Sequence, residues 1–270
     1  MPLLTELDAR AFSLINGLAR SKVEGVNNQC RSATFRCSII TLVTLAWSCL
    51  AFSGEIHDAA KNGDLEKVKT LLKDNPDLVF STNNVGLTPL HWAAFIGSKD
   101  MVELLLANKA MINAKSNQGM TPLHLAIFNH QKEVVDLLLT NKAEITIHDA
   151  AEGGYLEKVK EQIKANPSLV FSKNQLTGAT PLIYAAMFRR KEIVEYLLAN
   201  KADVNAVDND GKTSLHFVVR KNYSDLVELL LVSNADVNVK DKVGKTPLRI
   251  AMDWQNNDLA ELLRQHGGHE

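Results

Sequence analysis

Histidines beside polar residues are the side chains in this chain with the most evident capacity for chemistry. Three of them follow a threonine by three residues, and two others precede an aspartate directly: His91, His124 and His216, then His57-Asp58 and His148-Asp149. A neutral imidazole is a common zinc ligand, and an imidazole beside a carboxylate can act as a general base. These residue types therefore suggest two hypotheses, a metal site or a hydrolase. Whether either is possible depends on how the secondary-structure elements position the histidines and aspartates.

Similar turns recur along the chain at a regular spacing. They are Thr88-Pro89-Leu90-His91, Thr121-Pro122-Leu123-His124, Thr180-Pro181-Leu182-Ile183, Thr213-Ser214-Leu215-His216 and Thr246-Pro247-Leu248-Arg249. The leading threonines are separated by 33, 59, 33 and 33 residues. A fixed period of this length indicates one structural unit copied many times.

Each copy reads as two short helices. A threonine before Pro is a helix start, because its hydroxyl accepts an orphan backbone N–H and Pro at the first helical position loses nothing. Small pairs such as Ala93-Ala94 allow close helix packing, and a second helix carries an apolar stripe such as Val102, Leu105 and Leu106. A Gly-ended turn then leads to the next threonine.

This pattern resembles the ankyrin repeat, which reads Gly-x-Thr-Pro-Leu-His-x-Ala-Ala, then a Leu-rich helix, then Ala-Asp-Val-Asn. The resemblance covers roughly residues 55–270, and a glycine precedes each threonine by two residues: Gly86, Gly119, Gly178, Gly211 and Gly244. It implies an all-α ankyrin-repeat solenoid of about seven helix-turn-helix units with short β-turn fingers. Bulky residues stand where the family has left-handed glycine, and we expect a local cost of about 1 kcal/mol at each: Lys109, Lys142, Lys201, His130, Arg189 and Gln255.

The expected organisation is an amino-terminal segment over 1–53 and a repeat domain over 54–270. Its units lie near 55–86, 87–119, 120–146, 147–178, 179–211, 212–244 and 245–270. The two units without Thr-Pro-Leu, at Ile56-His57-Asp58 and Ile147-His148-Asp149, are near-duplicates 91 residues apart, which indicates a duplicated block. The third unit is short and lacks its projecting turn, so we expect either a seam near residue 146 or a continuous stack with one short loop.

The resemblance also bears on the histidines. In the family this ring hydrogen-bonds the threonine hydroxyl and neighbouring backbone, and one histidine per repeat is too widely spaced for a shared metal. The formal net charge is −1 and no basic stripe is present, which argues against nucleic-acid binding. No phosphate-binding loop or nucleophile motif occurs. We therefore expect no catalytic residues, no metal, no cofactor, no small-molecule substrate and no enzyme, with the His-Asp pairs as the remote alternative.

The segment over 1–53 reads as a signal. Its apolar core over 38–52 follows Arg31 and Arg36 and ends in Ala51-Phe52-Ser53, which is typical of an export signal cleaved after Ser53. We expect a periplasmic or secreted protein. A retained membrane anchor and a segment that is neither are the alternatives, although the core is shorter than the roughly 20 residues of a membrane span. The region before the apolar core is unusually long for an export signal. Two further interpretations account for this length: translation that begins at Val26, or a disordered extension.

In the ankyrin family the first helices and projecting turns line a concave, partner-binding surface. Counting Thr as the first position, the resemblance places the fifth, eighth and ninth residues on it, and the partner-binding candidates are Trp92, Phe95, Ile96, Phe128, Tyr184, Met187, Phe188, Phe217, Arg220 and Trp254. In the alternative, the fifth-position residues Trp92, Tyr184 and Phe217 pack mainly in the core. The turns at Asn117-Gln118, Asp208–Asp210 and Lys240–Val243 would add polar selectivity.

These inferences together predict an exported, monomeric ankyrin-repeat module that binds a partner protein through its concave face. A membrane-tethered envelope scaffold is the second hypothesis, in which the segment over 38–52 stays in place. The identity of the partner does not follow from the sequence, because a repeat framework fixes shape while its surface residues vary freely.

Overall fold

The computed structural model describes residues 54–269, which divide into two compact units at the bond between Ala143 and Glu144. This division lies close to residue 146, where the sequence predicts a seam. The predicted signal with its apolar core over 38–52 lies outside the described residues. Among residues 54–269, no helix combines the length and the apolar character needed to cross a bilayer.

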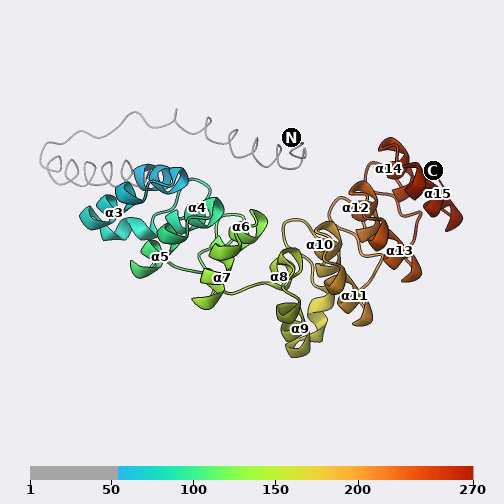
Figure 1. Cartoon of the computed structure of the whole chain (residues 1–270), viewed down its shortest axis with the longest axis horizontal. Coiled ribbons are helices and arrows are strands. Elements are labelled where there is room, and N and C mark those ends of the chain that lie inside the picture. Colours follow the sequence, from blue (N-terminus) through green and yellow to red (C-terminus); the bar gives the residue numbers. More distant parts are fainter. Residues whose placement is uncertain (1–53, 270) are drawn as a thin grey trace, which may run out of the picture. The chain divides into compact units, whose positions relative to one another are not determined.

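The amino-terminal unit, blue to green in Figure 1, consists of three helical pairs in sequence order. It is helical over 54–62 and continues with α3 (Leu65–Asp74), the 3-10 helix η2 (Pro76–Phe80), α4 (Pro89–Ile96), α5 (Lys99–Ala107), α6 (Pro122–Phe128) and α7 (Lys132–Thr140). The first helices α4 and α6 pack side by side, and α5 packs against both α3 and α7. Like elements of successive repeats are therefore neighbours within this unit, as a linear stack requires.

The carboxyl-terminal unit consists of four helical pairs (Figure 1). They are α8 (Ile147–Gly153) with α9 (Leu156–Ala165) and the 3-10 helix η3 (Pro167–Phe171), α10 (Pro181–Met187) with α11 (Lys191–Ala199), α12 (Ser214–Arg220) with α13 (Ser224–Val232), and α14 (Pro247–Asp253) with α15 (Asn257–Gln265). Helix α10 packs against α8 and α12, and α12 packs against α14. The helical-repeat solenoid expected from the sequence is confirmed.

Threonine hydroxyls start the first helices as predicted. Thr121 Oγ1 accepts the backbone N–H of His124 at 3.1 Å, and Thr246 Oγ1 accepts that of Arg249 at 3.2 Å. Helix α8 has the same cap, which we did not predict: Thr146 Oγ1 accepts the N–H of Asp149 at 3.1 Å. A cap of this kind contributes about 1 kcal/mol, so even the unit that lacks Thr-Pro-Leu keeps the usual helix start.

The core runs along each unit between its two layers of helices. The stripe residues Val102, Leu105 and Leu197 are fully buried, as are Ala93 and Ala94 on α4. The last residue of the predicted stripe, Leu106, is only half-buried, as are Leu139 and Leu198 at the same position of two other repeats. Small residues on the first helix and a two-residue apolar ridge on the second therefore form the contact between neighbouring repeats.

Between residues 54 and 269, eight residues other than glycine have positive φ, and six of them are the ones that the sequence marks. Lys109, Lys142 and Lys201 follow second helices with φ of 67°, 65° and 67°, while His130, Arg189 and Gln255 lie in interhelical turns at 57°, 55° and 56°. The other two, Asn222 and Asn234, carry the side chain that tolerates this conformation best after glycine. The prediction of left-handed backbone at the six bulky positions is confirmed.

The projecting fingers are tight turns that bond to one another within each unit. Gly86 and Gly211 close turns by donating to the carbonyls of Asn83 (2.9 Å) and Asp208 (3.1 Å). The Asn117 N–H donates to Val85 O at 3.0 Å, and the Asn209 N–H donates to Thr177 O at 2.8 Å, so adjacent fingers form a hydrogen-bonded row. Residues 141–146 connect α7 to α8 without such a finger.

Candidate functional site

His91 and His216 are structural residues with matching geometry. Each Nδ1 accepts the backbone N–H of its threonine, at 3.0 Å from Thr88 and 3.1 Å from Thr213, and lies 2.8 Å from that residue's hydroxyl oxygen. Each Nε2 faces a carbonyl oxygen of the next repeat, at 3.0 Å from Met120 and 3.2 Å from Lys245. Both nitrogens are therefore engaged in linking successive repeats.

The protonation state of these rings follows from their partners. A backbone N–H can only donate and a carbonyl can only accept, so Nδ1 is the acceptor and Nε2 carries the proton. Burial lowers the pKa of both His91 and His216, because desolvation penalises the charged imidazolium. The neutral ring fits this role, and a ring with both nitrogens in use has none to offer as a metal ligand.

The histidines of the two His-Asp pairs also face backbone carbonyls. His57 Nε2 lies 2.9 Å from Leu87 O, and His148 Nε2 lies 3.2 Å from Ser172 O. The His148 ring meets the Tyr184 ring edge-on at 5.7 Å between centroids. Burial lowers the pKa of His148, whereas the Asp149 carboxyl raises it to a lesser extent. His57 therefore bonds to the start of the next repeat, whereas His148 bonds within its own unit and reaches the next repeat through Tyr184.

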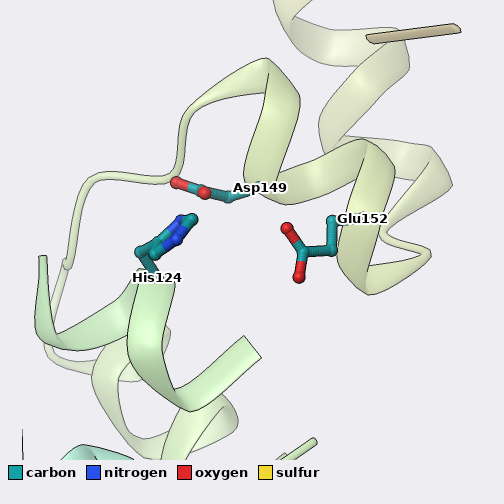
Figure 2. A group of neighbouring side chains, drawn as sticks. All are labelled: His124, Asp149 and Glu152. Carbon is teal, nitrogen blue, oxygen red and sulfur yellow. The ribbon is translucent and has the colours of Figure 1, made fainter. Parts of the chain in front are cut away.

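Figure 2 draws three of the polar side chains from these helix starts: His124 on the first turn of α6, and Asp149 and Glu152 one turn apart on α8. The backbone N–H of His124 donates to the Thr121 cap of its own helix. Both carboxyl residues of α8 are buried, with 5% and 2% exposed for Asp149 and Glu152. Asp149 thus differs from Asp58, its equivalent in the duplicated block, which is exposed.

The predicted contact residues of the amino-terminal unit lie on α4 and α6. Trp92, Phe95 and Ile96 are half-buried, and Phe128 is exposed by 45%. The Trp92 and Phe95 rings meet edge-on at 5.9 Å, and the Lys61 ammonium lies 5.4 Å from the Trp92 centroid. The Trp92 indole nitrogen is buried with no hydrogen-bond partner among residues 54–269. Helices α4 and α6 therefore share an aromatic strip that is only partly covered.

In the carboxyl-terminal unit the fifth-position residues are core. Tyr184 and Phe217 are only 8% and 7% exposed, because neighbouring first helices cover them, as in the alternative interpretation of the sequence. Burial also raises the pKa of Tyr184, whose hydroxyl lies 3.2 Å from Thr177 Oγ1. The other candidates remain accessible: Met187, Phe188 and Arg220 are half-buried, and Trp254 is 59% exposed.

Cations that stack on aromatic rings are the feature that sequence reasoning missed. The Arg189 guanidinium lies 5.1 Å from the Tyr223 centroid, and the Arg220 guanidinium lies 5.9 Å from the Trp254 centroid. Each pair joins two residues about one repeat apart. The repeat period could have suggested these pairs, because equal positions in successive units become neighbours, but the choice of rotamer could not be read from it.

The fingers predicted to add selectivity are partly structural. The Asp208 carboxylate accepts the N–H groups of Asp210 (2.8 Å) and Lys212 (2.9 Å), and burial raises its pKa. Asn117 Nδ2 donates to Asn84 O at 3.2 Å. The finger tips stay open to solvent; Val243, for example, is 76% exposed. Side chains at the finger tips are therefore better placed to contact a partner than the carboxylates that hold the turns together.

Comparison with known proteins agrees with this architecture. Ankyrin repeats (3 copies) match residues 56–149 and again residues 147–241. The chain is 38% identical over 68 residues to the E3 ubiquitin-protein ligase XBAT32 of Arabidopsis thaliana, which covers 25% of this chain and 13% of that protein. It is 30% identical over 170 residues to the transient receptor potential cation channel subfamily A member 1 of Drosophila melanogaster, over 59% of this chain and 12% of the channel.

A third relative is inversin of Gallus gallus, 36% identical over 78 residues, which is 28% of this chain and 7% of inversin. The chain thus spans only a small part of the length of these relatives. The match of ankyrin repeats over more than half of the residues, together with the stacked helical pairs and their threonine caps, shows that this chain belongs to the ankyrin-repeat family.

Proposed function

We propose that this protein is an exported, monomeric module that binds another protein through the first-helix faces of its units. Ankyrin repeats generally mediate protein–protein interaction and are typically non-enzymatic scaffolds. We define the first-helix face of a unit by its accessible eighth- and ninth-position residues: Phe95, Ile96 and Phe128 in the amino-terminal unit, and Met187, Phe188, Arg220 and Trp254 in the carboxyl-terminal unit.

The observation that carries the proposal is the exposure of large aromatic rings on these faces. Phe128 ends α6 and Trp254 directly follows α14, and the two side chains are 45% and 59% exposed, although the stack fully buries Leu123 and Ala251 on these helices. Aromatic side chains are the residues most enriched at binding hot spots, because they bury a large area at a low cost in conformational entropy. Their placement at helix ends also keeps the surface rigid before binding.

The test is a set of matched serine substitutions in the full chain. The face variants are F95S/F128S and F188S/W254S. Phe80 and Phe171 are 43% and 55% exposed on the 3-10 helices η2 and η3 and are not part of the first-helix face, so F80S/F171S is a control with the same chemistry. The partner is captured on the wild-type protein, identified by mass spectrometry, purified and then measured by surface plasmon resonance.

We expect each face variant to weaken binding by about ten-fold or more, because hot-spot truncations cost at least about 2 kcal/mol. The control should bind like the wild type, and all variants should retain their thermal midpoints. Face variants that bind normally would contradict the proposal. Loss of affinity only in F80S/F171S would instead place the binding surface on the 3-10 helices.

We propose export on the basis of the apolar segment over 38–52 and the small residues that end it. Fractionation of the producing cells tests it. A soluble envelope or medium protein whose first residue is Gly54 is the expected result. A full-length chain that sediments with membranes would favour the tethered scaffold instead, and a full-length chain in the soluble cell interior would contradict both.

A further inference from the structure

The last three interhelical turns of the carboxyl-terminal unit form one connected surface, which we call the turn ridge and define as residues 188–191, 220–223 and 254–256. Arg189 Nη2 donates to Asp225 Oδ1 at 3.2 Å while its guanidinium covers Tyr223, which joins the first turn to the second. Asn256 Nδ2 donates to Asn222 Oδ1 at 2.6 Å, which joins the second turn to the third. These contacts hold the turns in a fixed register.

The turn ridge carries uncompensated positive charge. Lys191, Arg220 and Lys221 have no carboxylate partner among residues 54–269, and all three are accessible to solvent. Two of the nearby carboxylates are already engaged: Asp225 pairs with Arg189, and Asp253 pairs with Lys245 at 2.7 Å and with Arg249 at 3.0 Å. The field at the ridge is therefore that of the unpaired cations, reduced by the carboxylates of Glu192 and Asp258 beside them.

The equivalent turns of the amino-terminal unit share part of this charge: Lys61 and Lys132 occupy the repeat positions of Arg220 and Lys191, whereas Asn62 and Asn129 stand in place of Lys221. These turns read Asn62-Gly63-Asp64, Gly97-Ser98-Lys99 and Asn129-His130-Gln131. The Asp64 carboxylate caps α3 by accepting the Lys67 N–H at 3.0 Å, and the Lys99 ammonium lies 3.9 Å from Glu103 Oε1. Lys221, and with it the adjacent pair of cations at 220–221, is therefore particular to the carboxyl-terminal unit, whereas the positions of Arg220 and Lys191 carry lysine in the amino-terminal unit as well.

Arg220 and Trp254 combine a charge with an apolar platform. The guanidinium lies over the indole, and this stacking fixes the plane of the guanidinium while its N–H edge remains free to donate to a carboxylate. Beside the indole is an open hollow lined by amides and one carboxylate, namely those of Asn222, Gln255, Asn256, Asn257 and Asp258. Amide side chains can both donate to and accept from a peptide backbone.

We propose that the turn ridge binds an acidic, extended segment of the protein partner. Its carboxylates pair with Arg220, Lys221 and Lys191, an apolar side chain lies on the Trp254 indole, and its backbone meets the amides of the hollow. A peptide fits better than a nucleic acid, because Asp258 and Glu192 beside the ridge would repel a backbone charged at every residue. The inference rests on the proposed function and specifies the chemistry of its partner.

The test uses defined peptides and the full chain, measured by isothermal titration calorimetry. The probe is a blocked peptide with four repeats of Glu-Leu-Gly, and its counterpart has Gln in place of Glu. We expect the Glu peptide to bind at least about ten-fold more tightly than the Gln peptide at about 50 mM salt, and to lose most of this advantage at about 300 mM salt. Equal affinities for the two peptides would overturn the proposal.

Two double variants with the same change in charge locate the site. R220Q/K221Q removes cations from the ridge, and K158Q/K160Q removes them from the exposed face of α9 in the same unit, where they pair with Glu161 and Glu157. We expect the ridge variant to bind the Glu peptide about ten-fold more weakly and the α9 variant to stay within about two-fold of the wild type. Equal losses in both would show a diffuse charge effect and overturn the assignment.

Two further measurements separate the possible failures. An oligothymidylate of similar length that binds more tightly than the Glu peptide and is lost in R220Q/K221Q would assign the ridge to a polyphosphate, which overturns the proposal. If the purified partner loses affinity in the first-helix face variants but not in R220Q/K221Q, this inference fails while the proposed function stands. If none of these variants weakens the partner, both fail.

Discussion

The amino-terminal and carboxyl-terminal units share a frame and differ in their faces. Leu105 and Leu197 occupy the same repeat position and are both fully buried, and Lys109 and Lys201 both have φ of 67°. The most exposed aromatic on the first helices is Phe128 in one unit, whereas in the other it is Trp254 beneath Arg220. Residues that hold the stack together are therefore the same in both units, whereas residues open to solvent differ. We expect the solvent-exposed residues to determine which partner is recognised.

The strongest test of an equivalent frame is a cavity at matched core positions. L105A and L197A each remove a fully buried side chain, and each should lower the free energy of unfolding by about 2–5 kcal/mol. Urea denaturation of the full chain, with hydrogen exchange to localise the loss, measures both. A loss of less than about 1 kcal/mol at one site would show that the two frames are not equivalent.

Matched finger glycines give the next largest expected effect. A Cβ at Gly86 would lie 2.7 Å from the Asn117 backbone nitrogen, and one at Gly178 would lie 3.0 Å from that of Asn209. G86A and G178A should each cost more than the roughly 1–2 kcal/mol of left-handed strain alone. Gly119 has φ of 77° and nothing within 4 Å of its Cβ position, so G119A is the strain-only control. Thermal unfolding would contradict this account if all three losses were equal.

Acidification should act on His91 and His216 alike. Burial lowers the pKa of both rings in the folded state. In the unfolded chain these histidines keep the ordinary pKa of about 6.5, so at a pH just below that value the unfolded chain binds more protons than the folded chain. Stability is therefore complete above that pH and falls as the pH drops toward the folded pKa values. Urea midpoints at about pH 7.5 and 5.5 should differ less in H91Q and in H216Q than in the wild type. An unchanged pH dependence in either variant would break the equivalence.

The smallest expected effect comes from relieving left-handed backbone. K109G and K201G should each stabilise the protein by about 0.5–1 kcal/mol, because glycine has no Cβ penalty at φ of 67°. N234G, at φ of 64°, should gain less, since asparagine already tolerates this region. Differential scanning calorimetry checks the order. A larger gain from N234G than from either lysine variant would contradict it.

The repeat pattern was enough to predict much of the fold. The threonine caps, the apolar stripes and the six bulky left-handed residues follow from local rules that act within a few residues of the chain. The helix start at Thr146 was missed because Ile147 and His148 replace the Pro-Leu that marks the other starts. A threonine hydroxyl can cap a helix whichever residue follows it. The absence of proline therefore removed the sequence pattern that marks a helix start, but not the cap itself.

The surface was harder to predict than the frame. Position in the repeat indicated which residues lie near the first-helix face, but not that Tyr184 and Phe217 are covered while Trp254 is open. Exposure depends on the sizes of the neighbouring side chains in the next repeat. The stacking of Arg189 on Tyr223 is a contact between residues far apart in sequence, with a rotamer set by tertiary packing.

The two tryptophans among residues 54–269 lie in different environments, so their intrinsic fluorescence can report on ligand binding. The indole nitrogen of Trp92 is sealed from water, whereas Trp254 is 59% exposed. A ligand that covers Trp254 should shift its emission to shorter wavelengths and shield it from iodide quenching, while Trp92 changes little. Docking on the carboxyl-terminal unit can therefore be followed in the unlabelled protein by its intrinsic fluorescence.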